Sequence, residues 1–196
     1  MKKAIIIICI IVATLGAGVL LSIYGNKAPG QATAQNDTVS NDFTHVPAGG
    51  QLLGNMQKAG LEALSSEGTA MHIHQHLDIV IKGKTIPVPA DIGVASGFIS
   101  AIHTHDGSGI LHIESPVKKD FTLNQFFKEW NMDFDDTHIG SYAADQNNKL
   151  IVAVNGSPIN NVQNYVVKPH DEIEIWYGNK NDAPSLIKDY TFPSGL

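Results

Sequence analysis

Residues 71–81 alternate apolar and polar side chains, and this period of two restricts the segment to a β-strand. Its apolar positions, among them Ile73 and Leu77, predict a face that packs on a core. The opposite face carries four side chains that can bind protons or metals: His72, His74, His76 and Asp78. Because Lys82-Gly83 can turn the chain into residues 85–88, the segment predicts the first strand of a hairpin.

A second hairpin is predicted from residues 99–105 and 110–114, which flank a turn-forming sequence rich in Gly and Ser. A two-residue turn at Gly107-Ser108 would pair His103 directly with His112. Four potential ligands would then share one face: His103, His105, His112 and Glu114. The opposite face would be apolar and would form part of the core: Ile102, Leu111 and Ile113.

Six of the nine histidines lie between positions 72 and 112. Residues two apart on a strand have Cα atoms about 6.6–6.8 Å apart, a gap that two imidazoles can close onto one ion, whereas residues four apart are separated by about 13 Å. We therefore expect only two of His72, His74 and His76 to bind the same ion, completed by histidines of the second hairpin. The pair His74 and His76 is the first choice.

The ligand types indicate a transition metal. Imidazole suits zinc and Cu²⁺, whereas Ca²⁺ and Mg²⁺ prefer oxygen ligands. The only cysteine, Cys9, lies in an apolar N-terminal run, so thiolates do not contribute. A zinc or copper ion is expected, with room for a second. Three carboxylates could orient the imidazoles through their free N–H groups or bind the ion directly: Asp78, Asp106 and Glu114.

The chain begins with a segment that predicts a membrane anchor. Met1-Lys2-Lys3 precedes a run without charge from Ala4 to Tyr24, about the 20 residues that a helix needs to cross a bilayer. Residues 1–24 are therefore expected to form a transmembrane helix or signal segment, with the N-terminus inside and the remainder outside the cytoplasm. Residues 25–50 contain few large apolar side chains, which predicts a flexible tether.

The rest of the chain predicts one extracytoplasmic, His-rich metal-binding domain at 51–178, followed by a weakly ordered tail at 179–196. A short amphipathic helix is expected over 51–64. A second, over 123–130, follows a capping-box sequence and carries apolar residues at helical spacing. The predicted fold class is α+β: mostly antiparallel β-hairpins with one or two packed helices, preceded by a single transmembrane helix.

The charge balance argues against one class of partner. The chain has 19 acidic residues against 13 basic ones, and all of the basic residues are lysines. An acidic surface without arginine lacks both the positive footprint and the guanidinium groups typical of nucleic-acid binding. The expected partners are a metal ion and, through the N-terminal helix, a membrane.

Several motifs resemble those of a known family. The sequences His72-x-His74-x-His76-Leu77 and His103-Thr104-His105-Asp106-x-Ser108-Gly109, continued by His112-Ile113-Glu114-Ser115-Pro116, resemble a largely uncharacterised family of exported, N-terminally membrane-anchored microbial proteins. The resemblance covers residues 71–178 and implies a shared domain without implying a reaction. The later half also resembles a β-grasp domain of the ubiquitin and sulfur-carrier type, which implies topology alone because the chain continues past Gly178.

Three functions are compatible with these features. The first is capture, buffering or delivery of zinc or copper outside the cytoplasm. The second is a metal-dependent hydrolase or hydratase, in which a histidine-bound metal lowers the pKa of its water to about 7 and Glu114 or Asp106 acts as the base. The third is a metal-free, pH-responsive interaction module, since histidine titrates near pH 6.5.

Overall fold

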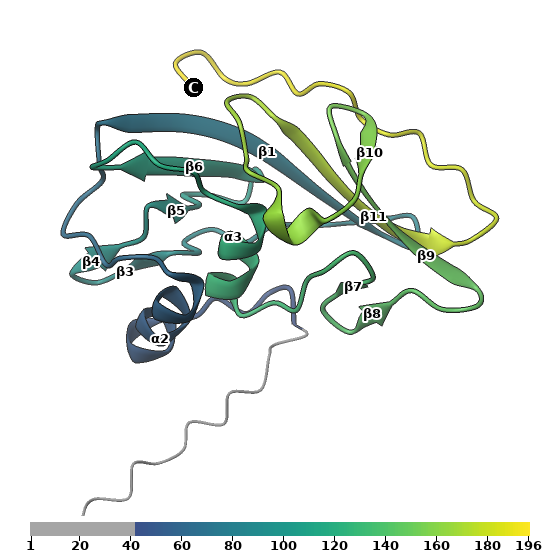
Figure 1. Cartoon of the computed structure of the whole chain (residues 1–196), viewed down its shortest axis with the longest axis horizontal. Coiled ribbons are helices and arrows are strands. Elements are labelled where there is room, and N and C mark those ends of the chain that lie inside the picture. The colour runs from purple at the N-terminus through teal and green to yellow at the C-terminus, as the bar shows by residue number, and fades with distance from the viewer. Residues whose placement is uncertain (1–41) are drawn as a thin grey trace, which may run out of the picture. The chain divides into compact units, whose positions relative to one another are not determined.

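The structure, a computed structural model, describes residues 42–196, and its main element is a seven-stranded sheet (Figure 1). Six strands follow the order β10-β9-β11-β1-β6-β5, and β2 also pairs with β1. The strands have the following bounds: β1 Met71–Ile81, β2 Lys84–Ile86, β5 Ile102–His103, β6 Ile110–Ser115, β9 Asn148–Val154, β10 Ser157–Ile159 and β11 Glu172–Asn179.

Strand β1 is the centre of this sheet. It pairs antiparallel with β6 over residues 71–76 and with β2 over 79–81, and it pairs parallel with β11 over 76–81. The other pairings of the sheet are antiparallel. The α+β class with mostly antiparallel strands is thus confirmed, and both predicted hairpins are present. The parallel pair β1–β11 joins segments far apart in the chain.

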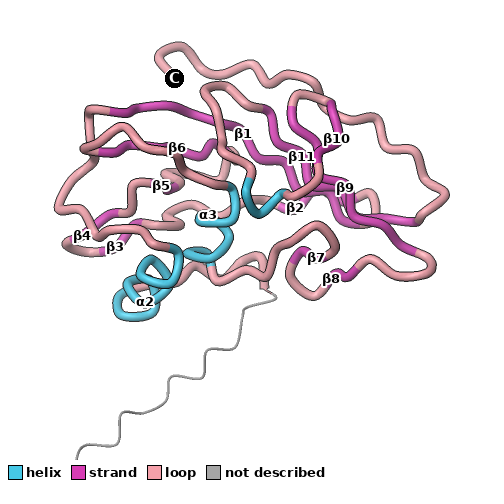
Figure 2. Tube along the Cα trace, viewed as in Figure 1, coloured by secondary structure: helices cyan, strands magenta, loops and turns pink. Residues whose placement is uncertain are grey.

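Two short hairpins and two α-helices complete the described part. The hairpins are β3 (Val94–Ala95) with β4 (Phe98–Ile99), and β7 (His138–Ile139) with β8 (Tyr142–Ala143). The helices are α2 (Gly49–Ala59) and α3 (Leu123–Trp130), and a 3₁₀ turn, η1, spans Val162–Asn164. Figure 2 shows both α-helices on the same side of the sheet.

Both predicted helices exist, although α2 is shorter than expected. Gly60 adopts a left-handed conformation with φ of 70°, and its N–H donates to the carbonyls of Met56 and Gln57. The helix therefore ends at Ala59, five residues before the predicted end at residue 64. A glycine in this conformation is a common helix terminator. Helix α3 begins as predicted, with the side chain of Gln125 accepting a hydrogen bond from the backbone N–H of Thr122 (2.9 Å).

The core lies between the sheet and the helices. The apolar residues of α3 are all buried: Leu123, Phe126, Phe127 and Trp130. From the sheet, the predicted apolar face contributes buried side chains that include Ile79, Ile113 and Leu111. One face of each central strand is therefore packed on the helices, and the alternation of the strand turns the histidines to the other face.

The C-terminal residues run back along the sheet, as the yellow segment of Figure 1 shows. The backbone N–H of Ile187 donates to the carboxylate of Glu174 (2.8 Å). The ring of Tyr190 stacks on His76 with 3.6 Å between ring centroids, and Phe192 stacks on His170. These contacts place the tail against the face that carries the histidines.

Within residues 42–196, no helix is long and apolar enough to cross a membrane. The predicted anchor, residues 1–24, and most of the predicted tether lie outside the described residues.

Replacing Phe127 should test the core. Its ring is fully buried and stacks on Phe134 with 4.1 Å between ring centroids. We expect Phe127→Ala to lower the free energy of unfolding by about 3–5 kcal/mol, because a large cavity remains in the core. Lys128→Ala on the exposed side of the same helix should change it by less than about 0.5 kcal/mol. Equal denaturant midpoints for the two variants would contradict this packing.

Candidate metal centre

The register of three strands brings the histidines together. In the β1–β6 pair His74 lies opposite His112, and His72 lies opposite Glu114. In the β5–β6 pair His103 lies opposite His112, as the predicted hairpin register required. Since directly opposed residues project to the same face of a sheet, His112 on β6 has a histidine on either side.

The ring nitrogens of neighbouring histidines lie at the separation of two ligands of one ion. The Nε2 atoms of His72 and His74 are 3.1 Å apart, and those of His103 and His105 are also 3.1 Å apart. An ion about 2.0–2.1 Å from each nitrogen would separate tetrahedral ligands by about 3.3–3.4 Å and adjacent square-planar ligands by about 2.9 Å. The observed separation lies between the two geometries, so it suits zinc and Cu²⁺ alike.

The donors form two groups that share two members. In each group the ligand atoms lie within 4.8 Å of one another. The first group contains His72, His74, His112 and Glu114, and the second contains His103, His105, His112 and Glu114. The Glu114 carboxylate places Oε1 3.2 Å from Nε2 of His72 and 3.3 Å from Nδ1 of His112.

Glu67 is a member of the cluster that the sequence did not reveal. Its Oε1 lies 3.4 Å from Nε2 of His105 and 4.0 Å from Nε2 of His103. The next residue, Gly68, packs so tightly that a Cβ there would clash with the backbone of Ser115. This close approach holds the loop before β1 against the end of β6. No spacing signal marks Glu67, because it lies in a loop.

Burial keeps the central imidazoles neutral. His103 is completely buried, and desolvation lowers its pKa to about 4, with the neighbouring His105 acting in the same direction. Desolvation and then His105 and His74 lower the pKa of His112 to about 3. The pKa of His74 is also lowered, first by desolvation. At neutral pH these rings therefore hold unprotonated nitrogens, the form that binds a metal.

The cluster has one side open to solvent. The side chains of His72 and His105 are 53% and 44% exposed, and that of Glu67 is 47% exposed. Glu114 lies deeper, and its pKa is raised by desolvation and by the adjacent Glu67 carboxylate. An ion could thus reach the centre from this side while resting on buried ligands.

His76 belongs to a separate group that could also hold an ion, with Asp78 and Glu172, so the expected pairing of His74 with His76 is not observed. Its Nδ1 lies 2.8 Å from a carboxylate oxygen of Glu172 and 3.5 Å from one of Asp78, and its Nε2 lies 3.0 Å from the carbonyl of Ser108. Desolvation opposes protonation of His76, but Glu172, Asp78 and the Ser108 carbonyl together raise its pKa. Both ring nitrogens therefore already have hydrogen-bond partners.

The acids of the last strand are covered by neighbouring segments of the chain. Strand β11 carries Glu172 and Glu174, and both are buried. Glu172 is covered because the parallel pairing sets it opposite His76, and Glu174 is covered by the tail at Ile187. Neither the parallel pair nor the path of the tail can be read from local sequence.

Asp106 does not join the metal-binding groups of the described residues. It lies in the turn between β5 and β6, where its carboxylate accepts a hydrogen bond from the backbone N–H of Ser108 (2.9 Å). Hydrogen bonds from the side chain and then from the backbone of Ser108 lower the pKa of Asp106. The histidines outside the two patterns have other contacts. His45 lies beside Gln51, and His138 lies beside Asp135.

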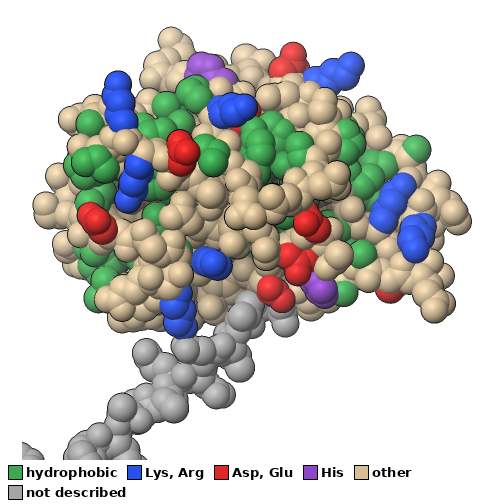
Figure 3. Space-filling model, viewed as in Figure 1, with side chains coloured by type: hydrophobic (Ala, Val, Ile, Leu, Met, Phe, Trp, Pro, Cys, Tyr) green, Lys and Arg blue, Asp and Glu red, His purple; other side chains and the backbone are tan. Residues whose placement is uncertain are grey.

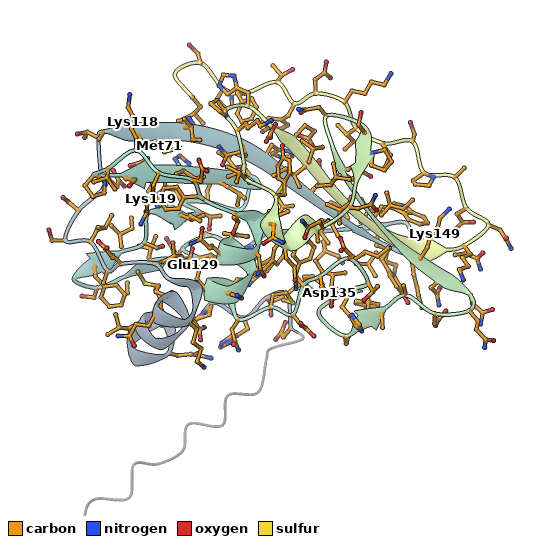
Figure 4. All side chains as sticks on the ribbon, in the orientation of Figure 1. Met71, Lys118, Lys119, Glu129, Asp135 and Lys149 are labelled. Carbon is orange, nitrogen blue, oxygen red and sulfur yellow. The ribbon has the colours of Figure 1, made fainter. Side chains whose placement is uncertain are left out.

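Behind the cluster, on the core side, lies a second acid that the sequence did not reveal. Glu129 on α3, labelled in Figure 4, is completely buried, and burial raises its pKa well above the ordinary value for a glutamate. A Cβ on Gly93 would touch both Glu129 (3.1 Å) and the Cβ of His103 (3.0 Å). The carboxyl is therefore neutral and packed close behind β5, the strand that carries His103.

Few histidines reach the face of the molecule drawn in Figure 3.

Comparison with family models, with curated proteins and with solved structures finds no match for this chain. The fold and the geometry of the cluster are thus the grounds for any functional conclusion.

Acid should destabilise the metal-free protein. His103 has a pKa of about 4 when folded and about 6.5 when unfolded, so its contribution to stability is complete above pH 6.5 and is lost as the pH falls toward 4. His112 extends this loss toward pH 3. In the chelator-treated protein, we expect the titration of His103 alone to lower the free energy of unfolding by about 2 kcal/mol as the pH falls from 7.5 to 5.

Thermal melts at the two pH values would measure this loss. His103→Gln should show a weaker dependence on pH, whereas His138→Gln, at an exposed site, should behave as the unaltered protein does. A melting temperature of the unaltered protein that stays constant from pH 7.5 to pH 5 would contradict the burial of neutral imidazoles.

Proposed function

We propose that this protein is held at the membrane by its N-terminal segment and binds zinc or copper outside the cytoplasm, for capture, buffering or delivery. The observation that carries the proposal is the pair of 3.1 Å contacts between ring nitrogens, His72 with His74 and His103 with His105, which flank His112 and Glu114. Uncharged imidazoles whose nitrogens converge are suited to an ion because each offers a lone pair.

The environment of the cluster supports reversible binding. His103 is buried and the side chain of His112 is only 11% exposed, and the sheet holds both in place, whereas His72 and His105 face solvent. The exposed ligands can exchange with water or with a partner's ligands while the buried ones stay in place. A donor set of nitrogen and oxygen without thiolate is compatible with an oxidising compartment, where cysteines would form disulfides.

The proposed location is supported by the sequence. Lys2 and Lys3 precede an uncharged run of the length of a transmembrane helix, and positive residues favour the cytoplasmic side. The polar composition of residues 25–50 would let the domain move relative to the membrane. The motifs that resemble the exported, anchored family are the strands and turns of this centre, which supports the same assignment.

A β-grasp-like topology is also proposed, and the strand order supports it. The strands β6-β1-β11-β9-β10 lie side by side, with the parallel pair β1–β11 at the centre and α3 between β6 and β9 in the chain. The β-grasp-like topology would then include β1 and span the whole domain, and would not be limited to its later half.

A metal-dependent hydrolase or hydratase is the second candidate. The observation in its favour is the open side of the cluster, where the Glu67 carboxylate lies beside His105 and is half exposed. A carboxylate at that position could accept a proton from a metal-bound water, whose pKa is lowered to about 7 by zinc. Turnover of an activated ester or of CO₂ by the zinc-loaded protein, lost in Glu67→Gln, would favour catalysis over storage.

The first measurement is the metal content of the full chain, purified in detergent without a histidine tag. We expect at least one zinc or copper ion per chain by mass spectrometry. Removal of the ion by a chelator should lower the melting temperature, because a ligand at 100 times its dissociation constant stabilises the folded state by about 2.7 kcal/mol. A protein without metal whose melt is unaffected by chelator and by added zinc or copper would instead favour the metal-free, pH-responsive module.

His112 gives the sharpest test of the site because it belongs to both groups. We expect His112→Ala to weaken metal binding more than about 100-fold, since even residues that merely orient a metal ligand contribute about 10–100-fold. His138→Ala removes an exposed histidine that lies beside Asp135 and should leave the affinity unchanged. Equal affinities of the two variants in isothermal titration would refute the proposed site.

A further inference from the structure

We infer that the centre holds two metal ions side by side, one on the histidine pair of β1 and one on the pair His103 and His105, and that Glu67 is a ligand of the second ion. This inference rests on the proposed function. It adds a second binding site, and it adds a ligand from the loop before β1.

The number of donors exceeds what one ion can use. Five imidazoles and two carboxylates converge on the cluster: His72, His74, His103, His105, His112, Glu67 and Glu114. Zinc takes four ligands in most proteins, and its coordination sometimes expands to five. A single ion would leave at least two of these groups beside it without a role in binding.

The donors also divide in space. The His72–His74 pair and the His103–His105 pair each have the 3.1 Å separation of ligands on one ion, and they lie on opposite sides of His112. Two ligands of one ion lie no more than about 4.2 Å apart even when they are trans to each other. The five histidines instead form two groups, which share only His112 and Glu114.

The carboxylates lie where two ions would need them. Glu114 touches both His72 and His112 through Oε1, a position from which its carboxylate can bridge two ions about 3.5–4 Å apart. Glu67 comes from the loop before β1, beside Glu114 and next to His105 and His103. Two adjacent carboxylates repel each other, and the positive charge of two cations bound beside them would offset that repulsion.

The first test is stoichiometry in the full chain, purified without a histidine tag and loaded with zinc or with Cu²⁺. We expect two tightly bound ions per chain. Two copper ions this close should couple magnetically, so the electron paramagnetic resonance signal per copper should fall well below that of an isolated ion. One ion per chain with a full signal would overturn the inference and leave the proposed function intact, whereas no bound ion would overturn both.

Matched double variants locate the two ions. His72→Ala/His74→Ala and His103→Ala/His105→Ala should each retain one copper, with the full signal of an isolated ion. If the centre holds one ion, the unaltered protein binds one copper with a full signal, and neither double variant removes one copper of two. The measurement on the unaltered protein decides the question even where a double variant folds poorly.

Glu67→Gln tests the additional ligand. The Glu67 side chain is half exposed, and the loop backbone is held by the hydrogen bond from the Gly68 N–H to the Glu114 carbonyl, so the change leaves the fold intact. In the double variant His72→Ala/His74→Ala, we expect this change to lower the affinity for the remaining ion by at least about tenfold. In His103→Ala/His105→Ala the same change should leave the affinity as it was. Equal effects of Glu67→Gln in the two backgrounds would overturn its assignment to the second ion.

Discussion

The antiparallel pairing of β1 with β6 is the constraint on which the site and the core both depend. In one register it places His74 opposite His112 on the outer face and buries Ile113 and Leu111 on the inner face. A slip by one residue would turn every side chain of β1 to the other face. Burial of apolar surface on α3 therefore also sets the positions of the ligands.

The same packing sets the electrostatics of the cluster. The face that carries His103 and His112 is shielded from water, so their protonated forms are disfavoured and their nitrogens are available at neutral pH. One edge of the cluster, at His72 and His105, stays open. A buried, neutral set of donors with an open edge can bind a cation firmly and still exchange it, which links the fold to the proposed function.

Neighbouring groups on one strand face have different chemistry because their surroundings differ. His74 lies among other imidazoles, which lower its pKa together with desolvation. His76, two residues along, lies opposite Glu172 and beneath Tyr190, and its pKa is raised. The alternation along β1 predicts the face shared by both histidines, but the partner strand on each side decides which group of potential ligands each of them joins.

The sequence by itself determined the elements and most of the ligand set, because alternation, turn residues and helical spacing are local properties. It predicted both hairpins, the His103–His112 register, the helix at α3 and the face shared by Glu114 with the histidines. Only the tertiary structure brought in Glu67 and Glu129, buried Glu172 and moved His76 to another group. Those positions depend on the parallel β1–β11 pair, the close contact at Gly68 and the path of the tail, all of which join residues distant in the chain and leave no periodic signal.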